Sequence, residues 1–315
     1  MRALLFPGQG SQVVGMASEL YNNFKIVKDI FNIADEKLKF SISEMIFNGP
    51  TDALQLTKNA QPAIMLVSYS IFTVLKKEFF FKFEKFKFFA GHSLGEYSAL
   101  VCSDSLKFED ALYLLHERGK AMQEAVPEGH GSMLAILGQS LENVQTILNE
   151  REDKDQACEI ANDNSEGQII ISGERKCIEK IKLFLKTKKI KSIPLKVSAP
   201  FHCSLMRHAA KKMEEKIIKT PFQKPKFNII SNVTSKVEID SNRIKKLLVE
   251  QIYSTVRWRE SILKMLEENV NCFVEIGPGK ALTGMIKRTI QNKNVNLFSV
   301  NSIADIKNFT NEFKK

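Results

Sequence analysis

Long apolar runs are absent from this 315-residue sequence, so we do not expect it to span a membrane. The most aromatic stretch, residues 79–89, is interrupted by charged side chains and falls short of the roughly 20 apolar residues that a spanning helix needs. Only four apolar residues precede Pro7, which is too short for a signal-peptide core and predicts a first strand.

Cysteine is also scarce. The five cysteines are odd in number and widely spread, and no pair has the spacing of a zinc or redox motif. We therefore expect neither a disulfide framework nor a structural zinc site, and we predict a reducing, cytoplasmic location.

Arginine contributes only nine of the 46 basic residues, although the formal net charge is +10. Arginine is the side chain suited to paired contacts with phosphates and bases, so the lysine-rich charge argues against a nucleic-acid partner. A solvated lysine-rich surface and an acidic protein partner both remain compatible with it. The ordinary 43% hydrophobic content excludes a disordered chain.

Strand-like and helix-like segments alternate along the chain, which predicts an α/β fold. Before residue 127, the pattern indicates strands over 3–6 and 86–90 and helices over 62–76, 97–101 and 109–125. The alternation of Lys and Phe over 81–88 indicates a loop and an exposed strand edge, where lysines discourage pairing between sheets. After Pro200, the pattern indicates helices over 205–219, 243–252, 259–268 and 282–290, and strands over 227–232, 272–276 and 296–300.

The middle of the chain follows the order βαββαβ, which is typical of a ferredoxin-like unit. Its predicted segments are strands over 132–137, 158–161, 168–172 and 190–197, helices over 140–150 and 176–186, and a turn over 163–167. A small unit inserted into a larger one explains the length better than two tandem domains. We predict a discontinuous core of residues 1–127 and 198–315, with a small subdomain over 128–197.

The strongest local motif is Gly91-His92-Ser93-Leu94-Gly95, between a predicted strand and a predicted helix. Gly-x-Ser-x-Gly in this context is typical of a nucleophile elbow, whose sharp turn lifts the serine hydroxyl above the sheet. The amide of Leu94 would then lie where it can donate to an oxyanion, helped by the helix dipole. A tight turn with an incidental serine is the alternative.

A nucleophilic serine needs a base, and the chain has five histidines. His202 follows the end of a predicted strand and precedes a helix, and catalytic groups gather in such loops. A purely structural histidine remains the alternative there. Two Gly-rich turns, Gly8-Gln9-Gly10 and Gly277-Pro278-Gly279, follow other strands in the same style and indicate further walls of a site.

Together these motifs resemble the malonyl-CoA:acyl carrier protein transacylases of fatty acid synthesis. The resemblance runs in the family's order from position 6 to about 288, and it includes Glu117-Arg118-Gly119 and Phe201-His202. It implies an α/β-hydrolase-like core with an inserted ferredoxin-like (βαββαβ) small subdomain.

The resemblance also implies a role for each matching residue. Ser93 would be the nucleophile and His202 its general base, while the amides of Gln9 and Leu94 would form the oxyanion hole. Arg118 would bind the malonyl carboxylate, since a guanidinium matches a carboxylate with two parallel hydrogen bonds.

Two further positions follow from the same family pattern. The backbone carbonyl of Gln251 would orient the imidazole, which makes the site a serine–histidine dyad rather than a triad. Phe201 would crowd out an α-methyl group, as in malonyl-selecting relatives.

The expected activity is ping-pong transfer of malonyl from malonyl-CoA to the phosphopantetheine thiol of an acidic acyl carrier protein, in a transient complex. It would need neither a metal nor a redox cofactor, and we expect a monomer. Docking of the phosphates or of the carrier is expected at Lys186, Lys188, Lys189 and Lys191, or at Lys287 and Arg288.

Two other activities remain open on the residues alone. A thioesterase or esterase would use the same elbow with a triad acid, for which Asp104, Asp110 and Asp163 are available. A non-catalytic carrier-binding or nucleic-acid-binding module would use only the positive charge.

Overall fold

The computed structural model describes residues 1–151, 153–290 and 294–313. Its larger part is built around a six-stranded sheet. In spatial order its strands are β10 (Asn296–Val300), β9 (Cys272–Ile276), β1 (Arg2–Phe6), β2 (Phe86–Gly91), β7 (Asn228–Ile230) and β8 (Val237–Glu238). The strands pair in parallel except β8, which runs antiparallel to β7. The carboxyl ends of the parallel strands therefore meet at one edge, where ligands bind in open α/β sheets.

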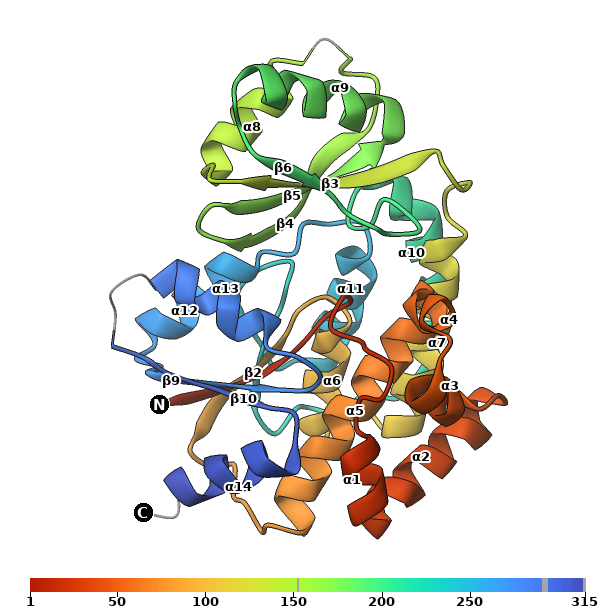
Figure 1. Cartoon of the computed structure of the whole chain (residues 1–315), viewed down its shortest axis with the longest axis vertical. Helices are drawn as coiled ribbons and strands as arrows, with labels where there is room; N and C mark the ends of the chain where they lie inside the picture. The colour runs from red at the N-terminus through yellow and green to blue at the C-terminus, as the bar shows by residue number, and fades with distance from the viewer. Residues whose placement is uncertain (152, 291–293, 314–315) are drawn as a thin grey trace.

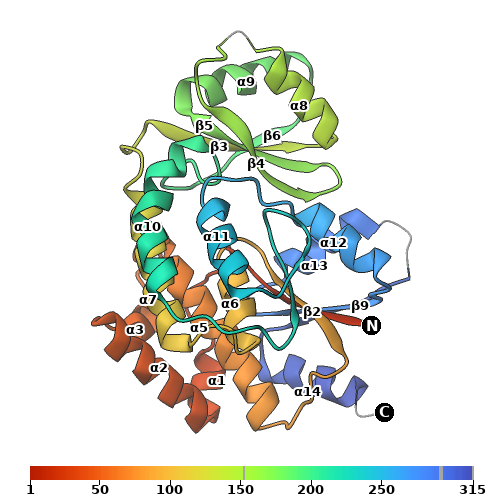
Figure 2. The same ribbon diagram turned by 180° about the vertical axis from the view of Figure 1, so that it is seen from behind.

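A smaller antiparallel sheet is built from one continuous stretch of chain. Its strands, in spatial order, are β4 (Cys158–Ser165), β5 (Gln168–Glu174), β3 (Gly131–Leu137) and β6 (Ser192–Pro194). Helices α8 (Leu141–Asn149) and α9 (Arg175–Thr187) cover its outer face, away from the larger sheet (Figure 1; Figure 2). The described chain is thus mixed α/β with two sheets, as the sequence predicts.

Helices cover both faces of the larger sheet. One face packs against α12 (Trp258–Glu267) and α13 (Ala281–Ile290), and the other shares one hydrophobic core with the remaining helices outside the small sheet. These are α1 (Ser18–Asn23), α2 (Lys25–Leu38), α3 (Ile42–Asn48), α4 (Thr51–Gln55), α5 (Thr57–Lys77), α6 (Gly95–Cys102), α7 (Phe108–Gln123), α10 (Arg207–Lys219), α11 (Ser241–Gln251) and α14 (Ile303–Glu312). None of the helices among the described residues has the length and apolarity needed to cross a bilayer.

Strand β1 shows how the sequence produces these layers. Leu4 and Phe6 belong to the core on the α5 side of the sheet, whereas Ala3 and Leu5 belong to the core on the α12 side. Successive side chains of a strand point to opposite faces, so a strand buried on both faces is apolar throughout. The short runs at 3–6, 86–90 and 272–276 are confirmed as buried strands for this reason. The predicted strand over 296–300 is confirmed as β10, a partly exposed strand at the edge of the sheet.

The expectation of an exposed strand edge over 81–88 is wrong. Strand β2 lies between β1 and β7 inside the larger sheet, and Phe86 and Phe88 are buried. The side chain of Lys87 is partly exposed, and its ammonium pairs with Glu268 at 2.7 Å. The charged residues therefore do not mark an edge.

Two expectations for the small sheet also need correction. Strand β4 extends to Ser165, so the predicted turn over 163–167 shrinks to its last two residues. Its polar side chains are satisfied from outside the small sheet: Asp163 accepts from Arg259 and Asn164 bonds with His92. The last strand covers three residues instead of 190–197, and it ends at a proline, which cannot continue the ladder.

Helices α1 to α4 and α14 have no counterpart among the predicted segments, and the predicted helix over 205–219 begins with a 3₁₀ turn at Ser204–Met206. Helices α1, α3 and α4 have only five to seven residues, too few for a clear periodic pattern. Helix α2 buries Val27, Ile30, Phe31 and Ala34 on one face, and this helical spacing could have predicted it.

Candidate active site

Ser93 lies on a tight turn between β2 and α6, with a left-handed backbone φ of 54°. The two glycines of its motif allow this turn. A Cβ on Gly91 would lie 1.9 Å from the backbone of Gly95, and a Cβ on Gly95 would lie 2.3 Å from the carbonyl oxygen of Phe6. The local geometry therefore matches a nucleophile elbow, since a non-glycine residue with this φ is held in place by its surroundings.

The hydroxyl of Ser93 bonds with a histidine. Its Oγ lies 2.8 Å from Nε2 of His202, and the other ring nitrogen, Nδ1, lies 2.8 Å from the carbonyl oxygen of Gln251. A carbonyl only accepts hydrogen bonds, so Nδ1 carries the proton and Nε2 is left free to accept from the serine. His202 also has a positive φ, 59°.

Arg118 reaches the same hydroxyl from helix α7. One guanidinium nitrogen donates to Ser93 Oγ at 3.2 Å and to Gln251 Oε1 at 2.9 Å, and the other donates to Gln61 Oε1 at 2.7 Å. The side chain is 1% exposed. The neighbouring Gly119 lets α7 pack closely against α5, because a Cβ there would lie 2.5 Å from the carbonyl oxygen of Thr57 on α5.

A second layer of amides supports the turn. Asn232 accepts from the amide of Ser93 at 2.7 Å and donates to the carbonyl of Gly91 at 2.8 Å. Gln251 Nε2 donates to the carbonyl of Ser93 at 3.1 Å and to the carboxyl of Glu96 at 2.7 Å. Asn232 and Gln251 therefore hold the turn through the backbone of Ser93 and make no hydrogen bond to its hydroxyl.

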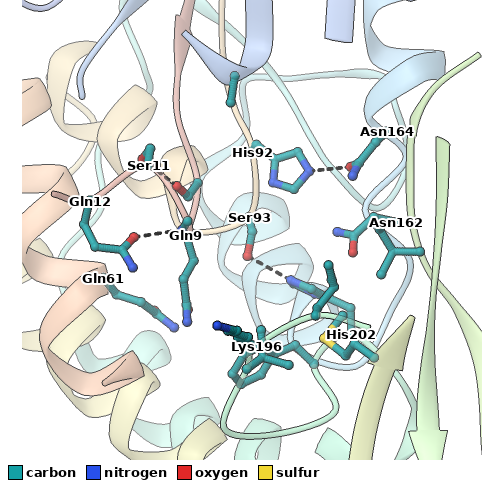
Figure 3. Close-up of a pocket in the computed structure, with 18 of the residues that line it drawn as sticks. Gln9, Ser11, Gln12, Gln61, His92, Ser93, Asn162, Asn164, Lys196 and His202 are labelled. Carbon is teal, nitrogen blue, oxygen red and sulfur yellow. Dashed lines mark hydrogen bonds between the residues drawn. The ribbon is translucent and has the colours of Figure 1, made fainter. Parts of the chain in front are cut away.

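These residues open into a cavity of about 460 Å³ between the two sheets. Gln9 in the turn after β1, Ser93, His202, and Asn162 and Asn164 of β4 surround it (Figure 3). Phe201 also lines the cavity. Leu94 follows Ser93 in the sequence and caps the N-terminus of α6. The first backbone amides of a helix have no partner within the helix. The structure thus gathers all seven predicted site residues, and their individual roles remain predictions.

Burial controls the ionisation of the site. It lowers the pKa of His202 to about 3, with the charge of Arg118 acting in the same direction. Burial also lowers the pKa of Arg118 and raises that of Glu96 to about 7. The imidazole is therefore neutral and able to accept a proton at neutral pH.

Several cavity or supporting residues escaped the sequence analysis. Asn232 follows a strand at the same sheet edge, a position that could have marked it. His92, beside the serine in the motif, lines the cavity and bonds with Asn164 at 2.8 Å. Gln61 lies within a helix, and nothing in its sequence context signals a role. Glu96 directly follows the elbow motif, and this position could have marked it.

The carboxylates available for a triad lie elsewhere. Asp163 pairs with Arg259, and Asp104 pairs with Lys226. Asp110 lies in the first turn of α7 and is not among the residues that line the cavity. Nδ1 of His202, the atom that a triad acid would bind, is taken by the Gln251 carbonyl. Among the residues that the structure describes, no three His, Cys, Asp or Glu side chains gather as a metal site.

Comparison with known proteins identifies the family. A model of the acyl transferase domain matches residues 3–314. The malonyl CoA-acyl carrier protein transacylase of Bacillus subtilis is 43% identical over 294 residues, covering 91% of this chain and 89% of that protein. The chain belongs to this transacylase family. The resemblance drawn from the motifs is confirmed, and the protein is an acyltransferase.

Solved structures of the transacylase family share the whole fold. An acyl-carrier-protein S-malonyltransferase from Bartonella henselae has a TM-score of 0.95 at 40% identity, covering 100% of this chain and 99% of that chain. A malonyl-transacylase in complex with its type II polyketide synthase acyl-carrier protein has a TM-score of 0.94 at 36% identity, covering 99% of each chain.

The low pKa of His202 gives a pH prediction. Its base form predominates above about pH 3, so labelling of Ser93 by a sulfonyl fluoride should proceed at similar rates at pH 8 and pH 5. An imidazole with an ordinary pKa of 6.5 would lose about 30-fold in rate at pH 5. The second-order rate of inactivation at each pH is the measurement, and such a fall would contradict the assignment.

Proposed function

We propose that this protein transfers malonyl from malonyl-CoA to the phosphopantetheine thiol of acyl carrier protein and so supplies extender units for fatty acid biosynthesis. The observation that carries the proposal is the hydrogen bond from buried Arg118 to the hydroxyl of Ser93. An acyl group on that oxygen would bring its own carboxylate within reach of the guanidinium. The malonyl group has such a carboxylate, whereas the acetyl group does not.

The reaction would proceed by ping-pong acyl transfer through a malonyl-serine ester. Ser93 attacks the thioester carbonyl as His202 accepts its proton, and the amides of Gln9 and Leu94 stabilise the oxyanion. His202 then protonates the departing coenzyme A thiolate. The carrier's thiol attacks the ester in the reverse sequence, with Gln251 orienting the imidazole throughout. Every proton and charge is handled by these groups, so we propose no metal or redox cofactor.

A hydrolase is the weaker alternative. Its triad acid would need to face Nδ1 of His202, and the Gln251 carbonyl occupies that position. A non-catalytic binding module would not require a serine and a histidine 2.8 Å apart in a cavity.

We also propose a division of the chain into two structural units. The small sheet has its strands in the order second, third, first, fourth along the chain, which supports a ferredoxin-like subdomain. We propose that it occupies residues 128–197 and that an α/β-hydrolase-like core occupies 1–127 and 198–315. Phe201, which lines the cavity, would limit its width against an α-methyl group.

The partner is proposed to be an acidic acyl carrier protein, bound transiently by a monomer. One structural neighbour is a malonyl-transacylase in complex with its acyl-carrier protein. Of the basic candidates, Arg288 contacts Ser165 and Gln168 in the β4–β5 hairpin beside the cavity. The cluster from Lys186 to Lys191 runs from the end of α9, a helix on the outer side of the small sheet, to the start of β6, and none of its lysines lines the cavity (Figure 1). We therefore favour Lys287 and Arg288 for docking. Five free cysteines support a reducing cytoplasm as the location.

The covalent intermediate gives the first test. After brief exposure to malonyl-CoA, the intact mass should rise by one malonyl group. Ser93→Ala should abolish this adduct, and His202→Ala should slow its formation by orders of magnitude. Ser98→Ala is the matched control, because Ser98 is a buried serine on α6, the helix that follows the turn, and it should retain the adduct. A malonyl adduct on the Ser93→Ala protein would exclude the mechanism.

The carboxylate contact gives the second test. Charged hydrogen bonds contribute about 1.5–3 kcal/mol, so Arg118→Ala should lower kcat/KM for malonyl-CoA by roughly 10- to 150-fold. Acetyl-CoA lacks the carboxylate, so its kcat/KM should fall much less. The preference of the enzyme for malonyl-CoA over acetyl-CoA should therefore become smaller. Methylmalonyl-CoA tests Phe201 in parallel, since Phe201→Ala should widen its acceptance. An unchanged preference for malonyl in Arg118→Ala would show that the carboxylate binds elsewhere.

A further inference from the structure

Two buried side chains near the nucleophile carry formal charge without a direct partner of opposite charge. Arg118 is 1% exposed and Glu96 is 2% exposed. Across the described residues, no ion pair within 4 Å involves either of them. A buried charge is costly unless it is compensated, so this arrangement needs an explanation.

The side-chain amide of Gln251 connects the two charges. Its Oε1 accepts from the Arg118 guanidinium at 2.9 Å, and its Nε2 donates to Glu96 Oε2 at 2.7 Å. The same carboxyl oxygen accepts from the amide of Asn232 at 3.1 Å. Polarisation of the Gln251 amide by both groups favours a cation at one end and an anion at the other. Glu96 and Arg118 thus form an ion pair separated by one amide.

Resting on the proposed function, we propose that Glu96 balances Arg118 in the empty site and takes up one proton from solvent when the malonyl carboxylate binds Arg118. The substrate supplies the direct anion that the guanidinium lacks. An ionised Glu96 would then leave two anions beside one cation in a buried region, and like charges disfavour ionisation. Protonation of Glu96 restores neutrality, and its other oxygen can still accept hydrogen bonds.

Two charged groups near Glu96 act on its pKa in opposite directions. Arg118 on α7 acts to stabilise the carboxylate, and Glu238 on β8 acts against it. Burial raises the pKa of neighbouring Tyr97 to about 12 and lowers that of His202 to about 3, so both are neutral. Glu96 itself, with a pKa raised to about 7 by burial, is poised to change protonation.

The linkage has a definite sign. Binding a carboxylate raises the pKa of Glu96 above its value in the free enzyme, so the complex holds more protons than the free enzyme. Affinity for malonyl-CoA is therefore greatest at low pH and falls as the pH rises through about 7, approaching tenfold per pH unit.

Calorimetry of malonyl-CoA binding to the non-reacting Ser93→Ala protein tests this, in buffers of different ionisation enthalpy. The slope of heat against buffer enthalpy counts the protons taken up. We expect about half a proton at pH 7 and more at pH 8, because Glu96 is then ionised in a larger share of the free protein. Acetyl-CoA should give no uptake, since it brings no carboxylate; this comparison needs no change at Glu96.

Glu96→Gln in the same background keeps an oxygen for both hydrogen bonds but cannot titrate. It should abolish proton uptake and make the affinity for malonyl-CoA independent of pH between 6 and 8. Glu275→Gln is the matched control, since Glu275 is a fully buried glutamate held by the amides of Leu282 and Thr283, and it should retain the uptake.

Three results would overturn the inference: no uptake with malonyl-CoA, equal uptake with acetyl-CoA, or unchanged uptake in Glu96→Gln. Binding without proton uptake contradicts this inference alone. Failure of malonyl-CoA to bind at any pH contradicts the proposed function and this inference with it.

Discussion

The hydrogen bond from His202 Nδ1 to the backbone carbonyl of Gln251 is the interaction on which the site depends. It sets the tautomer, so the ring presents a lone pair to the hydroxyl of Ser93. A carbonyl carries no full charge, and this leaves the imidazole less basic than a carboxylate partner would. The side chain of the same residue contacts Arg118, Glu96 and the carbonyl of Ser93. One glutamine therefore contacts His202, Ser93 and Arg118, the proposed base, nucleophile and carboxylate-binding group.

The fold explains why these groups meet. Strands β1 and β2 are parallel neighbours, so the turn containing Gln9 and the turn containing Ser93 end at the same edge of the larger sheet. Asn232 follows β7, the next strand along. The small sheet closes the space above this edge, with Asn162 and Asn164 facing the cavity. An ion pair between Asp163 and Arg259 attaches β4 to α12, and the side chain of Asp163 is only 1% exposed.

Much of this arrangement was predictable from the residues. Apolar runs identified the buried strands, and the glycines around Ser93 identified its turn, because both signals are local. The base and the carboxylate-binding group were harder to assign. His202 had only its position in a loop, and Arg118 became a candidate only through the family resemblance, since a helical arginine is usually exposed.

What the sequence could not provide depends on contacts between distant segments. The polar end of β4 resembles a turn until Asp163 meets Arg259 and Asn164 meets His92. The importance of Glu96 arises from Gln251, 155 residues away along the chain.

The central claim is that this site retains a malonyl group for a thiol and does not release it to water. The most direct measurement isolates the malonyl-enzyme and follows it by mass spectrometry with phosphopantetheinylated carrier protein or with buffer alone. The account predicts that the group passes to the carrier thiol while the enzyme in buffer keeps its adduct. Release of free malonate at the same rate in both samples would contradict it.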